Sequence, residues 1–114
     1  MSRDWRLYLD DVREACERIS RYVGEMDKAG FLADDKTYDA VLRNLEVIGE
    51  AAKKLPDDVR ARYGGVDWRK IAGFRDIIAH AYFGVDQAIL WDIVRNKVPA
   101  LMQQVRGTTD EKKG

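Results

Sequence analysis

Two long segments of this chain carry apolar residues at alternating spacings of three and four, and this periodicity constrains the fold more than any other feature. In the first segment, about residues 4–28, the positions are Trp5, Leu9, Val12, Cys16, Ile19, Val23 and Met26. In the second, about residues 36–55, they are Tyr38, Val41, Leu45, Ile48, Ala52 and Leu55. Such spacing gives a helix one apolar stripe. Two matching helices joined by a short connection predict an antiparallel hairpin.

Residues suited to helix ends divide the rest of the chain. Asp34 or Asp35 can accept hydrogen bonds from the free amide groups at the start of the second helix. Pro56 ends that helix and suits the first turn of a short one. Asp67 can cap a third main helix over about residues 68–82. These signals predict an all-α fold.

A fourth main helix is expected after residue 82. Gly84 suits a left-handed position behind the third helix, and Asp86 can cap the fourth. Pro99 must kink or split this helix because proline has no backbone N–H. The end of the chain is polar, so we expect one domain, residues 1–106, and a flexible tail, residues 107–114. The predicted architecture is a bundle of four main helices plus a short one.

The residue inventory excludes several classes of protein. The 114 residues, 46% hydrophobic and 35% charged, fit one small domain. A single cysteine excludes an internal disulfide, and a single histidine excludes a Cys/His zinc site within one chain. The 20 basic residues balance the 20 acidic ones, so nucleic-acid binding has to be local. Without a signal sequence or a span of about 20 apolar residues, we expect a cytoplasmic protein that does not contact membranes.

The only histidine lies in the predicted third helix, where polar residues gather away from the apolar stripe. Asp76 and His80 are four residues apart and share a helix face. Histidine transfers protons at neutral pH, Asp76 can orient its ring, and the planar donor group of Arg75 suits phosphate. RNA carries its own nucleophile, the 2′-hydroxyl. Arg75, Asp76 and His80 together therefore predict RNA cleavage without a metal ion. The alternative is an exposed histidine that simply pairs with Asp76.

One histidine per chain is too few for cleavage that uses both a base and an acid. A symmetric dimer that brings two copies of the third helix together supplies two Arg75 and two His80 side chains in one cleft. The position of His80, away from the apolar stripe, permits this arrangement.

The pattern Arg-x4-His-x-Tyr, at Arg75, His80 and Tyr82, resembles the signature of HEPN-domain proteins of the HepT-like ribonuclease toxin group. The surrounding residues agree with it, in the second helix at 44–53 and around the motif at 68–86. The match extends from the first helix to about residue 101.

The resemblance implies an all-α homodimer in which Arg75 and His80 line a cleft at the dimer interface and cleave RNA without a metal or other cofactor. It also implies that Asp76 supports the site. An antitoxin, a minimal nucleotidyltransferase, would transfer AMP to Tyr82 and so block the cleft. The alternative is a non-catalytic helical module that binds a nucleotidyltransferase or a nucleotide.

Two further features admit a functional and a structural interpretation. Trp68 and Trp91 can stack on bases, but their apolar neighbours favour anchoring in the core. Glu46 and Glu50 are spaced for metal binding, but without a second carboxylate pair a solvated helix face is favoured.

Overall fold

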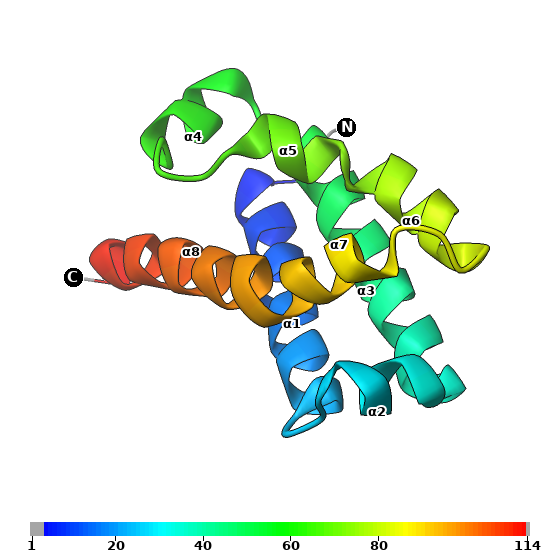
Figure 1. Ribbon diagram of the computed structural model, residues 1–114. Helices are drawn as coiled ribbons and strands as arrows, with labels where there is room; N and C mark the ends of the chain where they lie inside the picture. Colours follow the sequence, from blue (N-terminus) through cyan, green and yellow to red (C-terminus); the bar gives the residue numbers. More distant parts are fainter. Residues whose placement is uncertain (1–3, 114) are drawn as a thin grey trace.

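The computed structural model describes the backbone of residues 4–113 and the side chains of residues 4–105. Every regular element in that range is helical, which confirms the all-α prediction. The helices α1 (Trp5–Val23) and α3 (Asp35–Lys53) lie side by side and antiparallel, as the two periodic segments predict (Figure 1). A short helix, α2 (Lys28–Ala33), lies in the connection between them.

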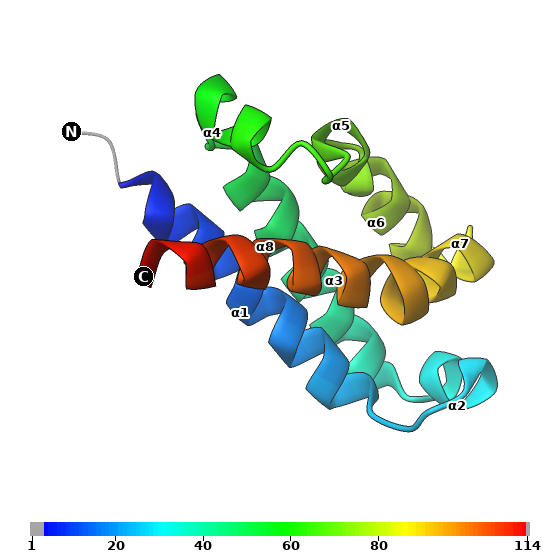
Figure 2. The ribbon, with the colours of Figure 1, turned by 90° about the vertical axis from the view of Figure 1, so that its left-hand side faces the viewer.

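The second half of the chain packs around this hairpin. Its elements are α4 (Asp57–Arg62), α5 (Trp68–Ala72), α6 (Phe74–Tyr82), α7 (Gln87–Asp92), a π-helical turn (Ile93–Lys97) and α8 (Val98–Lys113). Helices α5 and α6 pack on α3, and α8 crosses α1 (Figure 2). Across the described residues, none of these helices is both long enough and apolar enough to span a bilayer.

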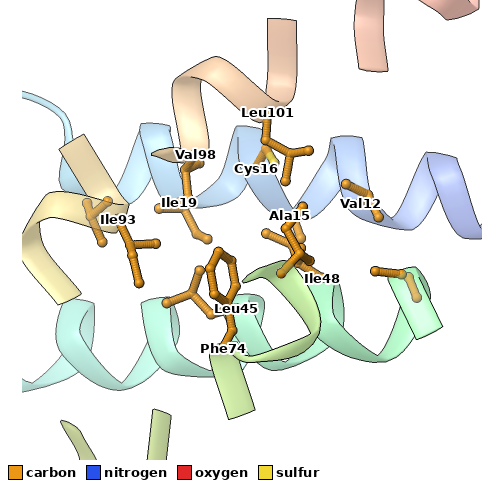
Figure 3. Close-up of a cluster of buried hydrophobic side chains, with 14 of the residues drawn as sticks. Val12, Ala15, Cys16, Ile19, Leu45, Ile48, Phe74, Ile93, Val98 and Leu101 are labelled. Atoms are coloured by element: carbon orange, nitrogen blue, oxygen red, sulfur yellow. The ribbon is translucent and has the colours of Figure 1, made fainter. Parts of the chain in front are cut away.

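The core forms where the hairpin meets α6 and α8. Figure 3 shows Ala15 and Ile19 of α1 facing Leu45 and Ile48 of α3, with Cys16 and side chains of the second half in the same cluster. The most enclosed large side chains of the molecule, with almost no exposed surface, are Phe31, Ile19, Leu45, Ile48 and Leu90. The two apolar stripes are therefore buried against each other, as their spacing predicts.

The prediction of one helix over residues 4–28 was wrong at its end. The helix α1 stops at Val23 because Gly24 adopts a positive φ of 50°, outside the helical region. A second helix then begins behind Asp27, whose side chain accepts a hydrogen bond from the Gly30 amide at 2.8 Å. Asp27 was a capping signal that the continuing apolar pattern concealed.

The prediction of one helix over residues 68–82 was also wrong, because Gly73 divides it into α5 and α6. A side chain at this position would place its Cβ 3.3 Å from the Lys70 carbonyl oxygen, a tight contact. Glycine is the weakest helix former after proline, so it is a favourable place for such a break.

The remaining signals for helix ends are largely confirmed. Asp34 accepts a hydrogen bond from the Thr37 amide at 3.0 Å, and Asp67 accepts one from the Lys70 amide at 3.1 Å. The helix α4 begins one residue after Pro56. Asp86 lies at the start of α7 as expected, but its side chain makes no capping bond, and its contact is described with the site below.

The expected split near Pro99 takes the form of a π-helical turn. The amide of Val98 donates to the carbonyl of Ile93, five residues earlier, instead of the usual four. This wider turn precedes Pro99, which has no N–H to donate. The helix α8 then continues to Lys113. The division into a domain of residues 1–106 and a flexible tail stays a prediction.

Cys16 gives a direct test of the core. Burial, with a smaller contribution from the charge of Glu17, raises the pKa of its thiol from 9.0 to about 12. Alkylating reagents react with the thiolate, so we expect labelling of Cys16 at pH 8 to be at least about 100-fold slower in the native protein than in urea.

The matched control is a Cys16→Ala, Glu14→Cys variant, which places the thiol at an exposed position of the same helix. Labelling of that variant should be fast with or without urea, as measured by mass spectrometry. Equal native rates for the two cysteines would contradict the buried stripe of α1.

Candidate active site at the end of α6

The helix α6 turns one apolar side inward and its polar residues outward. Phe74 and Ala81 are buried, whereas Arg75, Asp76 and His80 are exposed. This confirms that the only histidine lies away from the core. The side chain of His80 is 57% exposed and is thus open to a substrate or to a second protein.

The chain reverses directly after α6 in a tight, well-bonded turn. The Val85 amide donates to the His80 carbonyl at 2.8 Å, and the Gly84 amide donates to the Ala81 carbonyl at 3.0 Å. This pair of bonds is the Schellman motif, which requires a left-handed residue after the helix. Gly84 has a φ of 76°, so its predicted left-handed conformation is confirmed. The turn brings the next residues back towards the last turn of α6.

Asp86 is the residue that this reversal brings to the histidine. Its Oδ2 atom lies 2.7 Å from Nδ1 of His80, a hydrogen-bonding distance. The Asp86 side chain is 35% exposed, less than that of the histidine. Asp86 itself has a φ of 58°. Asp86 thus contacts the ring, a role that was not predicted because an aspartate before a helix was expected to cap it.

Asp76 lies in the first turn of α6 and is exposed. The ring nitrogen Nδ1 of His80 is paired with Asp86, so Asp76 is not the carboxylate that contacts this atom. A supporting role for Asp76 in the site stays a prediction.

A tyrosine of α3 holds the end of α6 in place. The Tyr38 hydroxyl donates to the Ala81 carbonyl at 2.6 Å, and the amide group of Gln87 donates to the Tyr38 hydroxyl oxygen at 3.4 Å. These bonds join α3, α6 and α7 one residue away from His80. Tyr38 was expected on the apolar stripe, and the bond from its hydroxyl was not predicted because the spacing of apolar residues does not reveal it.

Arg75 lies in the first turn of α6, and its guanidinium makes no ion pair or hydrogen bond with any described side chain. It precedes His80 by five residues, which is about 7.5 Å along the helix axis and about 140° around it. One chain therefore carries both groups on α6 but does not bring them together on one face.

Tyr82 and Phe83 form the most exposed aromatic pair on this part of the surface. They are 72% and 78% exposed, and their rings meet edge to face with centroids 5.1 Å apart. Val85 and Ile89 are also exposed apolar residues. We call these four residues the apolar patch. It adjoins His80 along the chain.

A groove of about 750 Å³ runs between α5–α6 and α7–α8. Phe74 and Ile77 line one side, Ile89 and Ile93 line the other, and Lys97 contributes a positive charge. Ile89, one of the four residues of the apolar patch, also lines this groove.

The two tryptophans for which the sequence allowed either base stacking or core anchoring are anchors. Trp68 donates from Nε1 to the Arg60 and Tyr63 carbonyls, each at 3.2 Å, and Trp91 packs on Phe31 with ring centroids 5.4 Å apart. Their roles as anchors are confirmed.

Glu46 forms an exposed ion pair with Arg43 at 2.8 Å, as expected for a solvated helix face. In the part of the chain that the structure describes, no three His, Cys, Asp or Glu residues are grouped to hold a metal ion.

Comparison with known proteins identifies the family. The profile of the family described as "Ribonuclease HepT-like" matches residues 12–107. A probable ribonuclease HepT of Thermococcus cleftensis is 44% identical over 101 residues, which cover 89% of this chain and 92% of the relative.

Two further relatives are putative RNases. One, from Methanocaldococcus jannaschii, is 44% identical over 90% of this chain and 85% of its own length. The other, from Caldanaerobacter subterraneus subsp. tengcongensis, is 36% identical over 95% of this chain and 96% of its own length. No solved structure matches the chain significantly. With a profile match over most of its length and relatives that align nearly end to end, the chain belongs to the HepT-like ribonuclease family of HEPN-domain proteins, as its Arg-x4-His-x-Tyr motif predicted.

Proposed function

We propose that this protein is the toxin of a toxin–antitoxin pair and acts in the cytoplasm as a homodimeric, metal-independent endoribonuclease. Arg75 and His80 are its catalytic residues, and Asp76 supports them from the first turn of α6. The observation that carries the proposal is the environment of His80. This only histidine of the chain is exposed to substrate yet held by a carboxylate, in a family named for ribonuclease activity.

The chemistry needs only proton transfer and charge stabilisation. A base removes the proton from the RNA 2′-hydroxyl, and that oxygen attacks the adjacent phosphorus. The bond from phosphorus to the 5′-oxygen breaks, and an acid returns a proton to the leaving oxygen. His80 is suited to both proton transfers, and the guanidinium of Arg75 can bind the phosphate oxygens as negative charge builds up on them.

A second copy of the chain completes the site in this proposal. Two features of the single chain support it: Arg75 and His80 point from different sides of α6, and the apolar patch next to His80 is exposed. Large apolar residues that lie together on a surface are typical of interfaces. A two-fold axis near α6 would cover the patch and place two copies of each catalytic residue in one cleft.

Tyr82 is the proposed target of the antitoxin, a nucleotidyltransferase that transfers AMP from ATP to the phenol oxygen and releases pyrophosphate. The side chain is 72% exposed and therefore open to a modifying enzyme. It lies two residues after His80 in the last turn of α6. An AMP group there would bring bulk and negative charge to the site and so repel the phosphates of RNA.

The catalytic assignment predicts that His80→Ala and Arg75→Ala each lower the rate of RNA cleavage by at least about 100-fold, the usual contribution of a general base or acid. Arg43→Ala is the matched control, because Arg43 is an exposed arginine of α3 far from the motif in sequence. It should cleave RNA like the wild type. The variants should stay folded and dimeric by circular dichroism and light scattering, with a mass twice that of the 13.1 kDa chain.

Wild-type cleavage should also persist in EDTA. Loss of activity in EDTA would contradict the metal-independent mechanism, and a monomer that cleaves at the full rate would rule out the shared cleft. If wild type and His80→Ala leave RNA equally intact, the alternative of a non-catalytic binding module is favoured. The exposed aromatic pair of the apolar patch supports that alternative.

The modification proposal predicts a mass increase of one AMP group when the protein is incubated with its partner transferase and ATP. The modified protein should no longer cleave RNA, because the group obstructs the cleft. Tyr82→Phe is the matched variant: it keeps the ring but has no hydroxyl to modify. An unchanged mass for the wild type, or an equal mass increase in Tyr82→Phe, would exclude Tyr82 as the target.

A further inference from the structure

We infer that Asp86 is a positioning residue for His80, which keeps the proton of the neutral imidazole on Nδ1 and leaves Nε2 free to act as the base. The inference rests on the proposed function of His80 and adds a residue outside the Arg-x4-His-x-Tyr motif. It concerns which nitrogen of the ring faces substrate with its lone pair.

The chemistry of the contact fixes which atom donates the hydrogen bond. Oδ2 of Asp86 lies 2.7 Å from Nδ1 of His80. An ionised carboxylate only accepts hydrogen bonds, so Nδ1 has to be the donor. A neutral imidazole carries one proton, and with that proton on Nδ1 the Nε2 atom holds a lone pair. The ring is then ready to accept a proton from the RNA 2′-hydroxyl without first changing its tautomer.

Asp86 differs from the other aspartates at the N-cap position of a helix. Asp4, Asp27, Asp34 and Asp67 each occupy this position, and each side chain accepts a hydrogen bond from an amide of its own helix. Asp86 occupies the same position before α7, yet its side chain makes no capping bond. Its carboxylate contacts the histidine and not an amide of its own helix, so it does not provide the usual stabilisation of an N-cap aspartate.

The backbone of Asp86 is also unusual. Its φ of 58° and ψ of 33° are left-handed, and among residues 4–113 it is the only residue other than glycine with a positive φ. Residues other than glycine rarely adopt the left-handed conformation, and those that do are enriched at functional sites. Asp86 comes two residues after Gly84, which also has a positive φ. The turn at Gly84 and the left-handed backbone of Asp86 together direct the carboxylate to the ring.

Hydrogen bonds hold both partners of the contact in place. The backbone of His80 accepts a hydrogen bond from Val85, next to Asp86, and Tyr38 anchors the neighbouring carbonyl of Ala81. Gln87, the residue after Asp86, donates to the same tyrosine hydroxyl. The two partners of the contact therefore belong to one bonded unit, although the contact itself is partly open to water.

Asp86→Asn tests the role with the least disturbance. Asparagine adopts the left-handed conformation readily, so the turn should persist. Its amide NH₂ can donate to Nδ1, which would move the ring proton to Nε2 and remove the base. We expect cleavage to fall about 10- to 100-fold, less than the about 10⁴-fold for a buried aspartate–histidine pair because this one is half-exposed. Asp57→Asn, at an exposed aspartate of α4, is the control and should leave cleavage unchanged.

The decisive readout is the tautomer of the ring. Because the chain has one histidine, the ¹⁵N signals of its ring in the NMR spectrum belong to His80 without further assignment. At a pH where the ring is neutral, the wild type and Asp57→Asn should show Nδ1–H. Asp86→Asn should shift towards Nε2–H. A change in the stability of the fold alone would not move this equilibrium.

Each outcome bears on the inference. A wild-type ring in the Nε2–H form, or an Asp86→Asn ring unchanged from the wild type, would overturn it, as would a tautomer shift with no loss of cleavage. If Asp86→Asn fails to fold, Asp86→Gly takes its place, since glycine accepts the left-handed backbone and carries no carboxylate. A wild type that cleaves no RNA refutes the proposed function, whereas the tautomer measurement still tests the contact.

Discussion

The left-handed turn after α6 is the constraint on which the candidate site depends. Gly84 takes a φ of 76°, and the turn that follows returns Asp86 to within 2.7 Å of the only histidine of the chain. If the helix continued, residue 86 would lie about 9 Å along the axis from residue 80, and the chain would lead away from the histidine. The pair of side chains therefore exists because the helix ends where it does.

The rest of the fold gives this turn a rigid support. The hairpin of α1 and α3 buries the two apolar stripes, and α6 packs on α3 through Phe74 and Ala81. Tyr38 then joins α3 to the last turn of α6. With its inner side fixed in this way, α6 can expose Arg75, His80 and Tyr82 outside the core without loss of packing. The buried side of α6 thus contributes to the core, whereas the residues proposed for catalysis lie outside it.

Much of this was predictable from the sequence, and the exceptions have physical causes. Heptad spacing locates α1 and α3 because it reports burial directly, and a helical wheel places His80 outside the core. The break at Gly73 was missed because the apolar pattern runs through it. Asp76 was expected to orient the ring of His80, since helix spacing brings residues four apart together, but the carboxylate at Nδ1 is that of Asp86. Asp86 approaches only through a left-handed turn, and at a helix start capping is the usual role of aspartate.

The central claim is that the turn at Gly84 acts on catalysis through Asp86, and a double-mutant cycle tests it most directly. Gly84→Ala forces a side chain into the left-handed region and should displace the carboxylate. RNA cleavage is measured for Gly84→Ala, Asp86→Asn and the double variant, under conditions where all three are folded by circular dichroism. The account predicts that the double variant cleaves no more slowly than the slower single variant, because both changes take the carboxylate of Asp86 away from Nδ1 of His80. Losses that multiply would contradict it, since the turn and the carboxylate would then act independently.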